Sequence, residues 1–135
     1  MSRDGSITFV WGDGEHPFRL PIGHLRELQE KCDAGPAEIA GRLANGRWRV
    51  DDVRETIRLG LIGGGMTPAD AYTRTVRYVD ERPLLESVPA AQAVLMAALV
   101  GVHEEPVGKG EAAEAETEAA TTGASPSPPS TAPAP

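Results

Sequence analysis

The first pattern along the chain is an alternation of polar and apolar side chains. Residues 6–11 (Ser-Ile-Thr-Phe-Val-Trp) alternate in this way, a Gly-Asp-Gly-Glu segment follows, and residues 16–21 read His-Pro-Phe-Arg-Leu-Pro. Two β-rich runs around an Asp-Gly turn predict a hairpin. Pro17 and Pro21 cannot donate to a strand ladder, so we expect the second strand to be short or at an edge. A two-stranded hairpin is marginally stable alone, and its apolar face is therefore expected to pack on helices.

After residue 21 the apolar spacing becomes that of amphipathic helices. The first helix is predicted over residues 22–32 and ends at residues 33–35. Pro36 begins a second helix that Asn45 and Gly46 end, and Asp51 or Asp52 opens a third that stops at residues 63–65. The inward-facing residues are expected to be Ile22, Leu25, Leu28, Gln29 and Cys32 in the first helix, Ile39, Ala40 and Leu43 in the second, and Val53, Ile57 and Leu61 in the third.

The fourth helix has a strong start signal, because Thr67 is followed by Pro68 and then by Asp70. Pro83 closes it, and a last helix follows. Pro89 lies inside the apolar stripe of that last helix, so the helix either kinks there or begins after Ser87. The predicted inner faces are Ala71, Thr75, Tyr78 and Val79, then Leu84, Val88, Ala91, Leu95, Ala98, Leu99 and Val102. The predicted fold class is α+β, mostly helical, with an N-terminal β-hairpin and about five short helices.

Composition divides the 135 residues into two parts. Residues 1–102 hold all six aromatic residues with 14 acidic and 12 basic ones, whereas residues 103–135 hold six acidic residues, one lysine and mostly Ala, Thr, Ser, Pro and Gly. The second part cannot bury enough apolar surface to offset the entropy of ordering. We therefore predict one small helical domain over residues 1–102 and a disordered acidic tail over residues 103–135.

The charge balance bears on the class of partner. Nucleic-acid binders usually present a basic face, and this chain has a net charge of −7. A local basic patch stays open as an alternative, formed by Arg47, Arg49, Arg54 and Arg58. The chain has no apolar run of about 18 residues and no secretory signal pattern, and its lone Cys32 fits a buried small hydrophobe in a reducing compartment. We expect a cytoplasmic protein that binds neither nucleic acid nor membranes directly.

One segment is similar to a phosphate-binding loop. Residues 60–67 (Gly-Leu-Ile-Gly-Gly-Gly-Met-Thr) match its glycine and threonine positions, but Met66 stands where the lysine must be, and the segment follows a predicted helix instead of a strand. A small nucleotide-binding protein is thus a weak alternative, and a flexible turn or hinge is favoured. The histidines and Cys32 lack the spacing of metal ligands or a catalytic triad. No catalytic, cofactor or metal residue is predicted, and we do not expect an enzyme.

With enzymatic and cofactor-binding roles not expected, the remaining interpretation is a domain that binds other proteins. Trp48 lies between two arginines in an inter-helix loop, where it is either a core anchor or an exposed recognition residue. The last helix is apolar nearly all round, which is more than packing on a small hairpin domain should require. The predicted contact residues, for a partner or for self-association, are therefore Trp48, Leu95, Met96 and Leu99.

Three collinear stretches, residues 9–20, 22–36 and 53–66, resemble the small proteins encoded in the tail-gene region of alphaproteobacterial gene transfer agents, described as tail tube or tail assembly chaperone proteins. The resemblance covers residues 7–102, and the chain departs from the family pattern at Pro89 and in its long tail. It implies a non-enzymatic role in assembling the tail of a phage-like particle, with the tape-measure protein and the tail tube subunit as partners.

The resemblance leaves two roles to compare. A mostly helical acidic domain with a mobile tail favours a cytoplasmic tail assembly chaperone, because tail tubes are usually built from β-sheets that join subunits. The alternative is a structural tail tube component that is incorporated in the particle.

Overall fold

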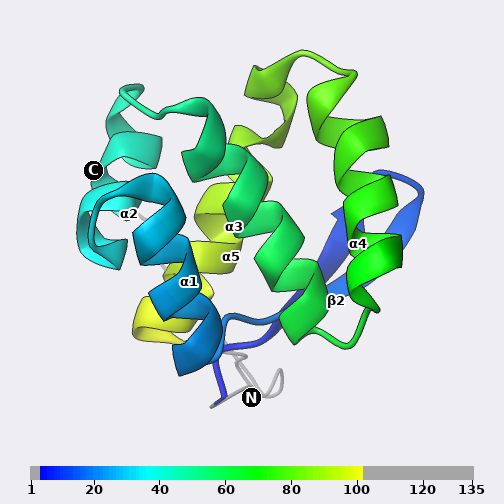
Figure 1. Cartoon of the computed structure of the whole chain (residues 1–135), viewed down its shortest axis with the longest axis horizontal. Coiled ribbons are helices and arrows are strands. Elements are labelled where there is room, and N and C mark those ends of the chain that lie inside the picture. The colour runs from blue at the N-terminus through cyan, green and yellow to red at the C-terminus, as the bar shows by residue number, and fades with distance from the viewer. Residues whose placement is uncertain (1–3, 102–135) are drawn as a thin grey trace, which may run out of the picture. The chain divides into compact units, whose positions relative to one another are not determined.

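The computed structural model describes residues 4–101, and the predicted tail at residues 103–135 lies outside the described residues (Figure 1). The fold is the predicted one, α+β and mostly helical, with a hairpin at its N-terminus. The elements are β1 (Ile7–Trp11), β2 (Gly14–Phe18), α1 (Ile22–Cys32), α2 (Pro36–Asn45), α3 (Val50–Gly63), α4 (Pro68–Thr75), the π-helical turn η1 (Val76–Asp80), the 3₁₀ turn η2 (Leu84–Ser87) and α5 (Val88–Val100).

The hairpin turns earlier than the sequence predicts. β1 and β2 pair antiparallel with Trp11 opposite Gly14, so the two turn residues are Gly12 and Asp13 and the second strand covers residues 14–18 instead of 16–21. Gly12 has φ +65°, and a Cβ there would lie 2.8 Å from the Tyr78 ring. The turn therefore needs glycine for its backbone conformation and for the closeness of Tyr78.

Aromatic side chains on the inner face fix the hairpin to the helices. Phe9 and Phe18 stack with centroids 4.7 Å apart, and Trp11 packs edge-on against Phe18 and Tyr78. The Trp11 indole also donates to Ser87 Oγ at 3.4 Å. Trp11 and Phe18 are buried. The expectation that the hairpin packs on helices through its apolar face is confirmed.

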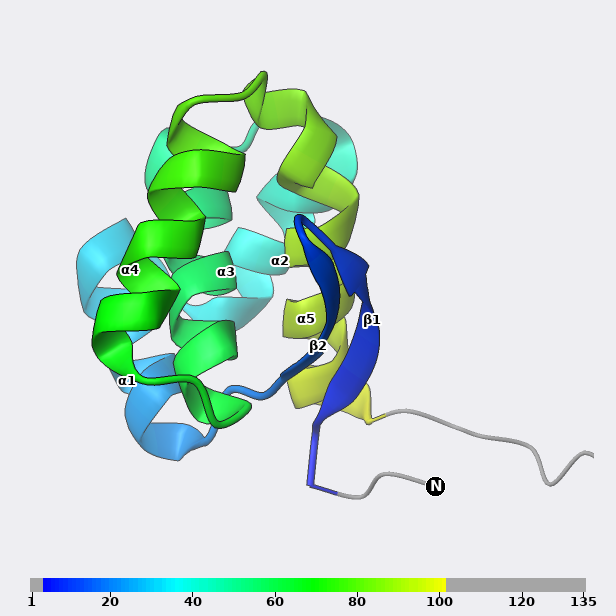
Figure 2. The same cartoon turned by 90° about the vertical axis from the view of Figure 1, so that its right-hand side faces the viewer.

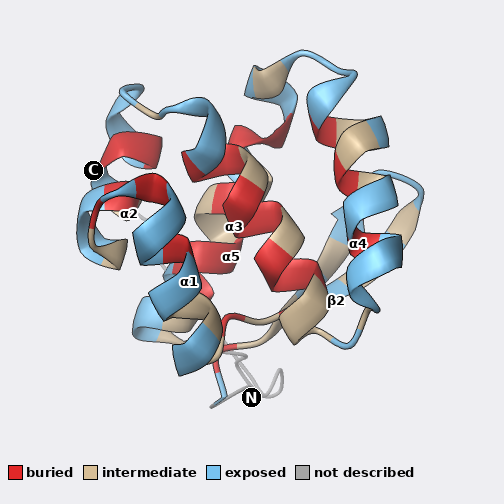
Figure 3. Ribbon diagram, in the orientation of Figure 1, coloured by how far each residue is buried: buried red, intermediate tan, exposed pale blue. Residues whose placement is uncertain are grey.

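The helices form layers around α3 and α5. α3 packs against α1, α4, α5 and β2, and α5 packs against both α2 and α3, with β1 beside it. In Figure 2 the hairpin and α5 lie on one side of α3, and α4 lies on the opposite side. Buried positions concentrate on α3 and α5 (Figure 3). The largest fully buried apolar side chains are Phe18, Leu28, Ile39, Val53, Ile57, Leu59, Leu61, Val79, Val94 and Leu95.

The helix bounds agree closely with the sequence, but the inner face of α1 is narrower than predicted. Of its expected stripe only Leu28 and Cys32 are buried, whereas Ile22 is 63% exposed and Gln29 is exposed. α1 is an outer helix that packs only on α3 and α2. One side of α1 therefore meets the core, and the positions at the margin of its stripe face solvent.

The ends of the later helices show which signals the chain uses. α3 begins at Val50 and not at Asp51 or Asp52, and Asp52 instead accepts a hydrogen bond from the Arg49 N–H at 2.8 Å. The predicted cap of α4 is confirmed, because Thr67 Oγ1 accepts from the Asp70 N–H at 3.2 Å. α5 begins after Ser87, with Pro89 in its first turn, and this is the second of the two predicted outcomes.

The glycines that end α3 allow it to lie against β2. A Cβ at Gly63 would overlap the Arg19 carbonyl, and a Cβ at Gly64 would overlap the Pro17 carbonyl. The Arg19 N–H donates to the Gly60 carbonyl at 3.0 Å across the same junction. The expected hinge is therefore wrong as an account of these glycines, because Gly63 and Gly64 form a close-packed contact.

Candidate functional site

In the segment that is similar to a phosphate loop, the amides of residues 64–66 are already hydrogen-bonded. The N–H groups of Gly64, Gly65 and Met66 donate to carbonyls of the preceding helix at 2.9–3.0 Å. A phosphate loop instead directs such amides at the phosphate, from the N-terminal end of a helix. Residues 60–66 lie at the C-terminal end of α3, where the dipole repels anions. The segment caps a helix and does not form a nucleotide site.

Arg54 and Arg58 form an ion-pair network that the sequence did not predict. Arg58 Nη2 lies 2.6 Å from Glu55 Oε1 and 3.5 Å from Glu27 Oε2, while Arg54 contacts Glu55 at 2.8 Å and Asp80 at 2.9 Å. The hydrogen bonds to Asp80 and Glu55 raise the pKa of Arg54 and Arg58, respectively. The network joins α1, α3 and η1. These two arginines are therefore paired with carboxylates and do not form the basic patch considered as an alternative.

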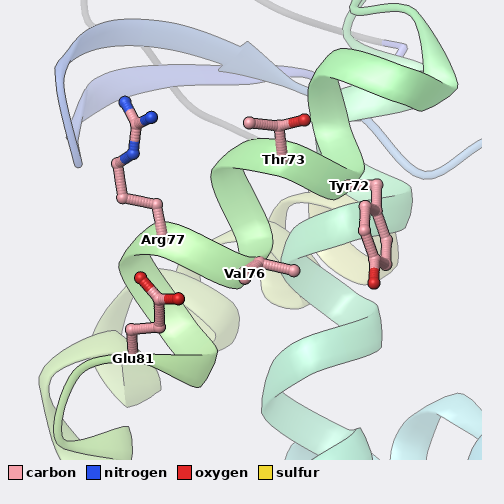
Figure 4. A pocket seen from close by; sticks show the side chains of 5 residues that line it. All are labelled: Tyr72, Thr73, Val76, Arg77 and Glu81. Carbon is pink, nitrogen blue, oxygen red and sulfur yellow. The ribbon is translucent and has the colours of Figure 1, made fainter.

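A shallow depression lies beside this network, on the outer side of α4 and η1. It has a volume of about 270 Å³ and is lined by Tyr72, Thr73, Val76, Arg77 and Glu81. Figure 4 shows these side chains spread along one continuous helical segment, with Arg77 and Tyr72 pointing in different directions. Ligand sites bring polar groups from several elements to converge on one volume. This depression has no such convergence.

A charged pair is buried between α2 and α3. Arg42 Nη1 lies 3.4 Å from Asp52 Oδ2, without hydrogen-bond geometry, and Asp52 is fully buried. Cys32 adjoins this pair, since its Sγ donates to the Asp51 carbonyl at 3.4 Å. Burial, followed by the charge of Asp52, raises the pKa of the Cys32 thiol to about 12. Cys32 is thus a buried, protonated side chain, as the sequence predicts, and not a nucleophile.

The predicted contact residues on α5 separate into core and surface. Leu95 is fully buried, so its prediction as a surface contact is wrong. α5 lies between α2 and α3 and next to β1, and this burial on several sides explains why the helix is apolar nearly all round. Met96 and Leu99 are 38% and 40% exposed, and Val100 is 65% exposed. These three residues, which we call the α5 end surface, leave apolar area uncovered within the described residues.

Trp48 is partly buried and packs against the hydrophobic core. This placement favours the role of a core anchor for Trp48 over that of an exposed recognition residue. Trp48 precedes α3, whereas the α5 end surface lies in the last turns of α5, so the two come from different elements.

The two outer edges of the hairpin differ. The pair next to a two-residue turn is hydrogen-bonded and the pairs then alternate, so the backbone groups of Thr8, Val10, Glu15 and Pro17 point outward. On β2, Pro17 has no N–H to offer and its carbonyl lies close to Gly64, the residue that follows α3, whereas Glu15 is exposed. On β1, Thr8 and Val10 are exposed, and within residues 4–101 no backbone bond from another element reaches them. Figure 2 shows β1 at the outside of the molecule.

Two absences hold for the described residues. Residues 4–101 contain no group of three His, Cys, Asp or Glu side chains placed to hold a metal ion. No helix in this part of the chain is long and apolar enough to cross a membrane.

Comparison with known proteins adds one finding. The family model described as phage tail tube protein, GTA-gp10, matches residues 4–101 of the chain. These are the same residues that form the described domain. We found no match among curated proteins and none among solved structures.

Proposed function

The chain belongs to the phage tail tube protein family GTA-gp10, and from this premise we propose that it is a non-enzymatic structural component of the tail of a gene transfer agent, a phage-like particle. The observation that carries the proposal is the extent of the family match, which spans the whole described domain and not one short motif. This places the tail tube role, the alternative of the sequence analysis, ahead of the assembly chaperone.

The proposed contacts are apolar. Met96 and Leu99 lie three residues apart on α5 and thus share a face, and Val100 extends that face. Exposed apolar area of this kind is a common feature of protein interfaces. We assign the tail tube subunit and the tape-measure protein as the partners of the α5 end surface. Trp48 contributes to binding only through the part of its ring that stays exposed.

The composition of purified particles tests the proposal. A tube component is retained in mature tails in many copies, and quantitative mass spectrometry should find the chain at a fixed ratio to the other tail proteins. Antibody labelling should decorate the tail along its length. Absence of the chain from intact particles would overturn the tube role.

The assembly chaperone is the second candidate, and the fold itself favours it. The described domain has only a two-stranded sheet, and Pro17 leaves the outer edge of β2 without one of its N–H donors. A continuous sheet through successive subunits needs two open edges in each. Three results together would establish this role. Deletion of the chain would stop tail formation, the chain would bind the tape-measure protein in cells, and purified particles would lack the chain.

Paired variants test the contact surface in either role. Met96→Gln with Leu99→Gln should weaken co-purification with tail partners while the thermal midpoint is retained, because both side chains are substantially exposed. Leu85→Gln is the matched control, since Leu85 is 68% exposed but lies before α5, in η2. Equal binding by both variants would place the contact elsewhere.

A further inference from the structure

The proposed tail contacts do not use the outer edge of β1. We infer that β1 pairs with β1 of a second copy of this chain, antiparallel and across a two-fold axis at Phe9, to make a four-stranded sheet. The inference goes beyond the tail role and holds for a tube component and for an assembly factor alike.

The edge of β1 lacks the features that normally prevent pairing. Strands at sheet edges are usually protected by charged residues, prolines, bulges or a covering element. β1 reads Ile-Thr-Phe-Val-Trp, with no charge and no proline, and it pairs with β2 in a regular register. Val10 is 76% exposed on its outer face. β2 instead has Pro17 on its outer edge, and the C-terminal end of α3 lies against that end of the strand, so this protection is found on one of the two edges.

The residues of β1 complement themselves under a two-fold axis. With Phe9 opposite Phe9 of the second copy, Thr8 lies opposite Val10 of that copy, and the outward N–H and C=O groups of both residues meet partners. On the outer face this pairs β-branched side chains, and on the inner face it pairs the two phenylalanines, which are partly exposed now. A register shifted by one residue would lose every one of these bonds, because outward groups alternate along the strand.

The charges at the two ends of β1 also match. Near its start, Arg19 Nε donates to the Asp4 carbonyl at 3.0 Å, and at the turn Arg74 lies 3.2 Å from Asp13. The hydrogen bond with His16 lowers the pKa of Asp13, which keeps this carboxylate charged. Antiparallel pairing brings the turn of one copy beside the strand start of the other. Each end of the hairpin thus holds one arginine beside one aspartate, so neither end carries an excess of one charge.

The contact closes at two copies. A two-fold interface uses the same patch on both subunits and leaves no further patch to extend. The remaining edges of the four-stranded sheet would be the two β2 strands, where Pro17 lacks an N–H and the Arg19 N–H, just beyond the strand, already donates to the Gly60 carbonyl of α3. The expected species is therefore a dimer and not a fibre.

Sedimentation equilibrium of the full chain over a range of concentrations is the first test. We expect a concentration-dependent species of twice the 14.2 kDa chain mass. Val10→Lys should weaken the dimer by at least about tenfold, because it places a lysine on the strand edge. Thr8→Pro should do the same by removing an outward N–H, as Pro17 does on β2. Glu15→Lys is the matched control, since Glu15 lies directly opposite Val10 but on β2, away from the proposed contact, and it should leave the dimer intact.

Amide hydrogen exchange supplies a second measurement and guards against unfolded variants. The amides of Thr8 and Val10 should become protected as concentration rises, while those on the outer edge of β2 should not change. Val10→Lys keeps the hairpin, because the new side chain faces Glu15, and its thermal midpoint should equal that of the parent chain at a dilution where both are monomeric. A monomer at about 100 μM, or a dimer unaffected by Val10→Lys, would overturn the inference.

Discussion

Leu95 and Leu99 lie one turn apart on α5, yet Leu95 is fully buried and Leu99 is 40% exposed. Leu95→Ala should lower the free energy of unfolding by about 2–5 kcal/mol, because it leaves a cavity between packed helices. Leu99→Ala should lower it by less than about 1 kcal/mol. Urea unfolding of both variants measures the difference, and equal losses would contradict the assignment of Leu95 to the core and Leu99 to the surface.

Gly64→Ala should destabilise the domain by at least about 2 kcal/mol, because the new methyl group would overlap the Pro17 carbonyl and force α3 away from β2. Gly41→Ala is the control. Gly41 lies in α2 with open space around its Cβ position, so alanine there should stabilise by about 0.5–1 kcal/mol. Thermal unfolding of both variants tests the contact, and a neutral Gly64→Ala would show that the junction is loose.

Asp52→Asn should cost about 3 kcal/mol of unfolding free energy. The amide still accepts from the Arg49 N–H, but the buried Arg42 guanidinium loses its buried charged partner and keeps only the exposed Glu38, 3.8 Å away. Asp51→Asn, one residue earlier and exposed, should cost less than about 1 kcal/mol. Chemical unfolding of the two variants separates the buried pair from a general effect of helix charge. Similar losses would indicate that the pair contributes nothing specific.

The Cys32 thiol should make the domain less stable at high pH. Its pKa is raised from 9.0 to about 12 in the folded chain, so the unfolded chain releases its proton first. The stability from the buried thiol is fully present below pH 9.0 and is lost as pH rises toward about 12. Cys32→Ala should remove this part of the pH dependence, as urea midpoints across the interval will show. Rapid alkylation of the native thiol near neutral pH would contradict its burial.

Truncation after Val102 should leave cooperative unfolding intact, with a thermal midpoint within about 4 °C of the full chain, because residues 103–135 are acidic and contain no aromatic residue. Calorimetry of both chains is the measurement. A broad, non-cooperative transition in the shortened chain would show that residues 103–135 contribute to the fold.

The sequence predicts local structure here better than it predicts contacts. The start of α4 follows from Thr67 and Asp70, three residues apart, and the end of α2 follows from Gly46, since both signals lie within one turn. The sequence does not place the hairpin turn correctly, because Gly12-Asp13 and Asp13-Gly14 overlap and either pair can form a two-residue turn. The structure uses Gly12 and Asp13, since the packing of the Tyr78 ring requires a glycine at residue 12.

Long-range contacts explain what the sequence missed in the candidate site. Arg54 pairs with Asp80, 26 residues away, and nothing in the spacing of either residue indicates this. Leu95 looks the same as Met96 in the apolar pattern of α5, and only the helices on either side decide which one is buried. The difference between the two edges of the hairpin also depends on long-range contacts, because the end of α3 lies against Pro17 and Arg19 and not against β1.

The hairpin and α5 lie at opposite ends of the described chain, and this affects the protein while it is being synthesised. Trp11 packs against η1 and η2, and the start of β1 meets α5, so the aromatic face of the hairpin is not fully covered until residues 88–100 have emerged from the ribosome. At ordinary elongation speeds that interval is on the order of 10 s. During translation the nascent chain presents an uncovered aromatic face together with an open strand edge. We expect this to be the period in which the chain is most prone to aggregate.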